Sequence, residues 1–211
     1  MNYEEWRNEL FGQPPEMRPA LFEHCPEFYR VPPNQAFDYI DRVLVDPEVH
    51  TLFSKEQLGN GINTIYSLNC SDLPSLYKTE GDEARRIRGI ENLISLYKNY
   101  FERYCTGAVK SIGNDNTDGS MGYICYMFWD VFILYPGNAT PAMINATLRV
   151  MRMALESHND NCLTSAIHGL GHKVRYAPEA SKILQQWLLR PTTKNPEILQ
   201  YAQIATTGRI N

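Results

Sequence analysis

Apolar residues recur three and four positions apart along most of this chain, and the strict alternation of apolar and polar residues that marks a half-buried strand is missing. In the segment NQAFDYIDRVL, residues 34–44, the side chains of Phe37, Ile40 and Leu44 fall on one side of a helix. Similar apolar stripes follow along the rest of the chain. The pattern therefore predicts an all-α fold.

Cap residues and prolines mark where the predicted helices begin. Ser54, Thr140 and Asp160 are placed as N-caps, and Pro178 and Pro196 open the last two helices. Taken in order and paired as antiparallel hairpins, the predicted helices are 34–45 with 54–69, 83–105 with 119–135, 140–158 with 160–174, and 177–190 with 196–209.

The two helices of each later hairpin differ in side-chain size. The first opens on proline and carries bulky apolar residues such as Met151 and Trp187, whereas the second is rich in small residues, as in SAIHGLGH and YAQIATTG. Stacked repeats need this difference, because small residues let neighbouring helices approach while large ones fill the space between layers. In this respect the chain resembles the HEAT-like family of helical repeats over about residues 34–209. The resemblance is architectural and brings no functional motif with it.

The resemblance implies an α-solenoid of about four stacked antiparallel helix pairs, in a single helical-repeat domain over residues 32–211. Residues 1–31 hold one short helix and an irregular segment with several prolines, so we expect them to form an N-terminal cap. The same helices also fit a non-repeating globular bundle, which is the alternative architecture.

Composition and charge narrow the classes of function. The net charge is −4, without the excess of basic residues typical of nucleic-acid-binding domains, so we expect no nucleic-acid partner. The most apolar stretch, MGYICYMFWDVFILY at 121–135, is shorter than the roughly 20 residues that span a bilayer, and it contains Asp130. We expect this stretch to be a buried helix, and no contact of the protein with a membrane.

The 5 cysteines are scattered, odd in number and without a CxxC pair. The first residues, MNYEEWRNELFG, are acidic and amphipathic, unlike a secretory signal peptide. Both features predict reduced thiols and a cytoplasmic protein. Phosphate-loop, dinucleotide-binding and nucleophile-elbow patterns are absent, so we predict no cofactor.

The stretch SAIHGLGHKV, residues 165–174, most resembles a chemical site. His168 and His172 are four residues apart, so both imidazoles project from one side of a helix, as in zinc-binding HExxH helices. Gly169 stands where that motif has its glutamate, and no third ligand lies close by in the sequence. The favoured interpretation is that Gly169 and Gly171 admit a neighbouring helix while the histidines line a groove, and we predict no bound metal.

Asp130 lies within the apolar run YMFWDVFI, where an unpaired carboxylate would be costly. Arg149 and Arg152 on the following helix are its natural partners, so we predict a structural ion pair. The alternative is a carboxylate that faces a groove.

Two classes of function remain. The favoured one is a non-catalytic protein-binding module, such as an adaptor, an inhibitor or an immunity-type protein, whose concave face binds another protein. A homo-oligomer is compatible with the same surface. The alternative is a metal-assisted or lyase-like enzyme with a pocket formed by His168, His172 and Asp130. The binding residues predicted from the side-chain types that anchor interfaces are Tyr66, Tyr126, Trp129, Asp130, His168, His172 and Tyr176.

Overall fold

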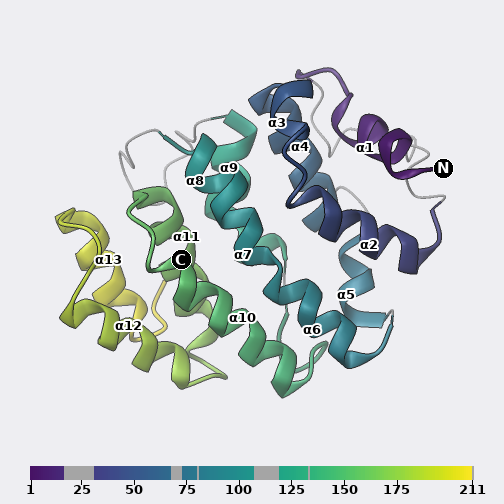
Figure 1. Ribbon diagram of the computed structural model, residues 1–211. Helices are drawn as coiled ribbons and strands as arrows, with labels where there is room; N and C mark the ends of the chain where they lie inside the picture. Colours follow the sequence, from purple (N-terminus) through teal and green to yellow (C-terminus); the bar gives the residue numbers. More distant parts are fainter. Residues whose placement is uncertain (17–30, 68–72, 80, 107–118, 133, 211) are drawn as a thin grey trace.

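The computed structural model describes residues 1–16, 31–67, 73–79, 81–106, 119–132 and 134–210. Over these residues the chain forms helices and connecting turns and no strand (Figure 1). The prediction of an all-α fold is confirmed for this part of the chain.

The first half of the chain contains the predicted helices at 34–45 and 54–69, with slightly different bounds. It also contains several short helices that the sequence pattern did not predict individually. The helical segments are α1 (Tyr3–Phe11), α2 (Pro33–Val43), α3 (Val49–Leu52), α4 (Lys55–Tyr66), the 3₁₀ turn η3 (Leu73–Ser75) and α5 (Leu76–Thr79).

The second half follows the predicted order closely. The long helix expected at 83–105 is divided into four consecutive pieces, one of them π-helical. The segments are α6 (Glu83–Glu91), α7 (Leu93–Leu96), the π-helical η4 (Tyr97–Phe101), α8 (Glu102–Tyr104), α9 (Gly119–Val131), α10 (Pro141–Ala154), α11 (Asp160–Lys173), α12 (Glu179–Leu189) and α13 (Pro196–Ala205).

Two of the predicted caps are confirmed, and Asp118, which the sequence also places as the cap of the helix at 119–135, lies outside the described residues. Ser54 forms a reciprocal capping box with Gln57 at the start of α4, and Thr140 accepts a hydrogen bond from the Met143 backbone at the start of α10. Asp160 is not a cap, because Asn159 accepts the backbone hydrogen bonds at the start of α11. The Asp160 carboxylate instead accepts hydrogen bonds from two side chains in the turn between α12 and α13, Thr193 (2.8 Å) and Asn195 (3.0 Å).

The second helices of the four predicted hairpins lie next to one another. Helix α4 contacts α9, α9 contacts α11, and α11 contacts α13 (Figure 1). The first helices of the last two hairpins pack against this row: α10 contacts α6, α7 and α11, and α12 contacts α11 and α13. In the C-terminal part of the chain, the small-residue helices α11 and α13 thus contact each other, and the bulkier α10 and α12 pack against α11.

Glycines set the close approach of these helices. A Cβ atom on Gly59 of α4 would lie only 2.5 Å from the Met121 backbone nitrogen of α9. A Cβ atom on Gly169 of α11 would lie 2.5 Å from Cγ of Trp129 on α9, and one on Gly171 would lie 2.5 Å from Ile210. The prediction that Gly169 and Gly171 make room for close neighbours is therefore confirmed.

One hydrophobic core runs through the described part of the chain and includes α1. Trp6 and Phe11 of this helix are fully buried, although they belong to the segment that we expected to form a cap. Polar contacts also hold α1: Asp46 accepts hydrogen bonds from the Tyr3 hydroxyl (2.7 Å) and from Arg7 (2.8 Å). Among the described helices, none has both the length and the apolar character needed to cross a membrane.

The contact between α4 and α9 is tested by Gly59→Ala. At an open helical position this change stabilises a protein by about 1 kcal/mol. Here the added methyl group meets the backbone of Ser120 and Met121, which cannot rotate away, so we expect the free energy of unfolding to fall by about 1–3 kcal/mol. Urea denaturation measures it, with Glu56→Ala at an exposed position of the same helix as the control. A Gly59→Ala variant more stable than wild type would contradict the close approach.

The anchoring of α1 is tested by Asp46→Asn. Burial raises the pKa of the Asp46 carboxyl, but the hydrogen bonds from Tyr3 and Arg7 outweigh it and hold this pKa below its usual range. A carboxyl group whose pKa is lower in the folded protein than in the unfolded chain stabilises the fold at pH values above the unfolded pKa of about 3.9. This stabilisation is lost as the pH falls through the pKa of the folded protein. We therefore expect Asp46→Asn to cost about 1–3 kcal/mol at pH 7, with a smaller cost below about pH 4.

Urea denaturation of wild type and of Asp46→Asn from pH 7 to pH 3 measures this cost. Asp38→Asn is the control, because Asp38 is largely exposed and its ion pair with Arg85 contributes little to stability. A cost for Asp46→Asn that stays constant from pH 7 to pH 3 would show that the charge of Asp46 is not responsible.

Candidate functional site

Three of the residues predicted to bind a partner converge between α9 and α11. Nε2 of His168 lies 2.7 Å from Oδ2 of Asp130, and Nε2 of His172 lies 3.0 Å from Oδ1 of the same carboxylate. The two Nε2 atoms are 3.1 Å apart. The four-residue spacing on α11 places both imidazoles on the side of the helix that faces α9, where Asp130 is located.

The ring of His168 is buried and fixed from several sides. Its Nδ1 atom forms a short hydrogen bond with the hydroxyl group of Tyr201 on α13. The ring of Tyr126 lies 5.0 Å from the His168 ring, and the ring of His172 lies 4.6 Å from it, centre to centre. Residues from three helices thus determine where Nε2 of His168 points.

Asp130 pairs with the histidines and not with the arginines that we predicted. In the structure, Arg149 instead binds Glu91 of α6, through a contact of 2.6 Å. Burial raises the pKa of the Asp130 carboxyl, but the hydrogen bonds and charges of His168 and His172 together outweigh burial and hold this pKa well below its usual range. The carboxylate is therefore ionised at neutral pH.

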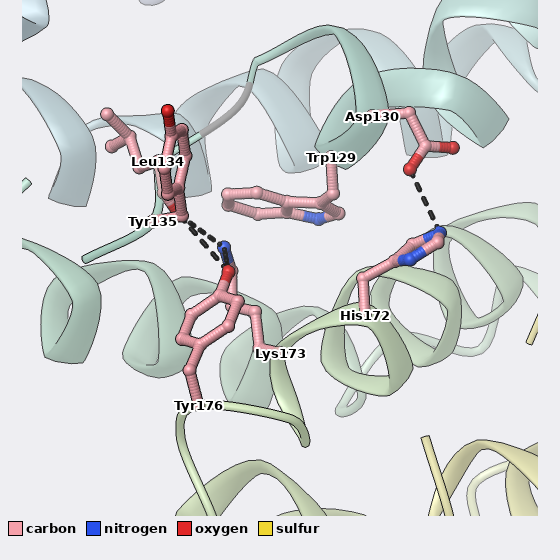
Figure 2. Close-up of a pocket in the computed structure, with 7 residues that line it drawn as sticks. All are labelled: Trp129, Asp130, Leu134, Tyr135, His172, Lys173 and Tyr176. Carbon is pink, nitrogen blue, oxygen red and sulfur yellow. Dashed lines mark hydrogen bonds and ion pairs between the residues drawn. The ribbon is translucent and has the colours of Figure 1, made fainter. Parts of the chain in front are cut away.

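The cluster opens onto a pocket of about 220 Å³. The side chains of His172 and Asp130 are 39% and 26% exposed, so both can contact a molecule in the pocket, whereas His168 lies behind them. Figure 2 shows Asp130 and His172 at one end, Trp129 along the middle, and the other lining residues at the opposite end. These are Leu134, Tyr135, Lys173 and Tyr176.

Lys173 brings a buried cation to the pocket wall. Its ammonium group donates to the Leu134 carbonyl oxygen (3.0 Å) and to the Tyr176 hydroxyl (3.3 Å), and it lies 5.7 Å from the centre of the Trp129 ring. Burial lowers the pKa of Lys173 to about 8, although the negative charge of Asp130 opposes the shift. The pocket thus has a carboxylate with two imidazoles at one end and an ammonium group at the other.

The remaining predicted residues separate into two groups. Tyr176 is partly exposed at the pocket, and Trp129 is a buried lining residue whose indole nitrogen donates to the Tyr97 hydroxyl (2.8 Å). Tyr126 contacts the cluster through His168. Tyr66 lies elsewhere: it is fully buried on α4, with its ring against Phe128 and other aromatic side chains, and it lines no part of the pocket.

Sequence reasoning missed Lys173, Tyr135 and Tyr201. Lys173 is the last residue of α11 and Tyr135 lies in the connection after α9, positions where such residues are usually solvated, and nothing in the local pattern distinguishes them. Tyr201 is 33 residues from His168 in the sequence, so only the packing of α13 against α11 brings it to the site.

Comparison of the chain with protein-family models, with curated proteins and with solved structures gives no match. A function for this chain is therefore inferred from the geometry of this site.

The role of Tyr201 in holding His168 is tested by Tyr201→Phe. The change leaves Nδ1 of a buried imidazole without its partner, so we expect the free energy of unfolding to fall by about 1–3 kcal/mol. Tyr123→Phe is the matched control, because Tyr123 is an exposed tyrosine and its hydroxyl group is accessible to water. Equal stability of the two variants in urea denaturation would show that the hydroxyl of Tyr201 does not hold His168.

Proposed function

We propose that this chain is a non-catalytic protein-binding module, built as a HEAT-like stack of helix hairpins. The neighbour relations of the helices support this architecture: α4, α9, α11 and α13 follow one another in a row, and α10 packs against α6 and α7 outside it. In an α-solenoid the second helices of successive hairpins form such a row, and they line the face that partners use. The cluster and its pocket belong to α9 and α11, two helices of this row.

The observation that carries the proposal is the pocket, because it gathers the side-chain types that anchor protein interfaces. Exposed tyrosines, a tryptophan and charged groups surround one depression. A volume of about 220 Å³ is smaller than the roughly 300–1,000 Å³ of pockets that enclose a drug-sized ligand or cofactor. The size therefore suits an anchoring side chain of a partner protein.

A cytoplasmic location and the absence of an organic cofactor are parts of the same proposal. Among the residues whose structure is described, Cys105, Cys125 and Cys162 are free and buried, which is common in proteins of reducing compartments. The net charge of −4 gives no reason to expect nucleic acid as the partner. A second copy of this chain is one candidate for the bound protein.

The proposal is tested by capturing partners from an extract of the cells that encode the chain, with Tyr135→Ala beside Tyr123→Ala. Both residues are tyrosines with nearly equal exposure, 46% and 44%, but only Tyr135 lines the pocket. A central interface residue contributes about 2 kcal/mol or more, so we expect Tyr135→Ala to weaken binding of the captured partner by about 30-fold or more. Equal capture by both variants, or no specific partner in the extract, would contradict the proposal.

A metal-assisted or lyase-like enzyme is the second candidate function. It is favoured by the convergence of Asp130, His168 and His172 beside an open pocket, because acid–base or metal-assisted chemistry needs such groups within reach of a substrate. This candidate requires turnover of a small molecule at the pocket, whereas the protein-binding function requires only a complementary surface.

A further inference from the structure

We propose that Asp130, His168 and His172 form a binding site for a divalent transition-metal ion of the zinc type, with one coordination position open to the pocket. The inference goes beyond the protein-binding function and does not depend on it. It differs from the favoured interpretation of the sequence, in which the histidines line a groove without a bound metal, and takes up the alternative that groups Asp130 with them; the structure brings this carboxylate to the histidines from α9.

The spacing of the ligand atoms fits one small ion. Zinc binds imidazole nitrogen and carboxylate oxygen at about 2.0–2.1 Å in tetrahedral geometry, so its ligand atoms lie about 3.3 Å from one another. The three closest contacts in the cluster are 2.7, 3.0 and 3.1 Å. The two nitrogens contact different oxygens of Asp130, and one ligand atom from each of the three residues lies within 4.8 Å of the other two. Small shifts of these side chains therefore bring one oxygen and both nitrogens to bonding distance of a common centre.

Hydrogen bonding accounts for this arrangement only when both Nε2 atoms carry protons. If both Nε2 atoms carry protons, His168 donates to Oδ2 and His172 to Oδ1 of Asp130, and the two N–H groups then lie side by side with their nitrogens 3.1 Å apart. If only one carried a proton, the other histidine could not donate to the carboxylate beside it. A cation among the three residues instead accepts the lone pairs of both Nε2 atoms and balances the charge of Asp130.

The surroundings of His168 are those of a metal ligand. A metal-bound histidine usually donates its second ring N–H to an oxygen atom, which fixes the tautomer and the orientation of the ring. Nδ1 of His168 is hydrogen-bonded to the hydroxyl group of Tyr201, whose oxygen can accept that proton when Nε2 binds a metal ion. Because His168 is buried and contacted by Tyr126 as well, its Nε2 atom is directed at the site before any ion arrives.

The ligand set and its exposure indicate the class of metal and the open position. Two imidazoles and one carboxylate favour zinc and neighbouring transition metals over Mg²⁺ and Ca²⁺, which prefer oxygen ligands. Three protein ligands leave a fourth tetrahedral position for water or a ligand atom. The partly exposed His172 and Asp130 border the pocket, so this position faces it. With Lys173 in the pocket wall, an oxygen atom of an anionic group suits that position best.

The test is a titration of the full chain with Zn²⁺ by calorimetry, after treatment with a chelator. We expect one ion per chain, no binding of Mg²⁺ under the same conditions, and an affinity at least tenfold weaker in His172→Gln. His172 is partly exposed, so this variant is suited to retain the fold. The matched control is His158→Gln, at an exposed histidine outside the cluster, whose affinity should equal that of wild type.

Two further measurements make the result specific. Co²⁺ in place of Zn²⁺ should give visible absorption of a nitrogen and oxygen site without sulfur-to-metal charge transfer, which excludes the cysteines as ligands. Zn²⁺ at about 100 times its dissociation constant for wild type should raise the melting temperature of wild type, and the same Zn²⁺ concentration should raise that of Asp130→Asn by less.

Absence of a stoichiometric ion from wild type, thiolate absorption with Co²⁺, or equal Zn²⁺ affinity of wild type and His172→Gln would each overturn the metal site. None of these outcomes bears on partner capture, because Tyr135→Ala leaves the three ligands unchanged. The two proposals can therefore fail separately.

Discussion

The close approach of α9 and α11 at Gly169 is the constraint on which the rest of the site depends. The indole of Trp129 occupies the space that a side chain at position 169 would need. Asp130 follows Trp129 directly, so the contact that seats the indole also carries the carboxylate to the histidines of α11. A larger residue at position 169 would separate the two helices, and the contacts of Asp130 with both imidazoles would lengthen together.

Polar bonds inside the core reinforce this contact. The hydroxyl of Tyr97, in the π-helical turn, accepts a hydrogen bond from Trp129 and lies 2.8 Å from the hydroxyl of Ser165 on α11. Because all three side chains are buried, each bond that is lost would leave a polar group without water or a partner. The π turn interrupts the regular helix, and such turns occur often where a side chain serves a site. These hydrogen bonds therefore fix the position of α9 relative to α11.

Local patterns predicted the helices well, because apolar spacing, prolines and caps act within a few residues. The relations between helices were harder to predict. Arg149 was the expected partner of Asp130 because it lies on the next helix, but the rotation of α10 directs it to Glu91, while α11 brings two histidines to the carboxylate. Tyrosine is a residue type that often anchors interfaces, which is why Tyr66 was predicted to bind a partner, but Tyr66 is buried in the core. Tyr201 was not predicted, because only tertiary packing brings it to the site. The His168–His172 pair was evident in the sequence, whereas Asp130 was grouped with it only in the alternative, enzymatic function.

The free energy of unfolding of Gly169→Ala tests the central claim most directly. Alanine is the better helix former by about 1 kcal/mol, so a helix without a close neighbour would become more stable. The structure instead predicts a loss of about 1–3 kcal/mol, because the new methyl group meets the indole of Trp129. A Gly169→Ala protein that is more stable than wild type would contradict the account, since α9 and α11 would then not be in contact at this glycine.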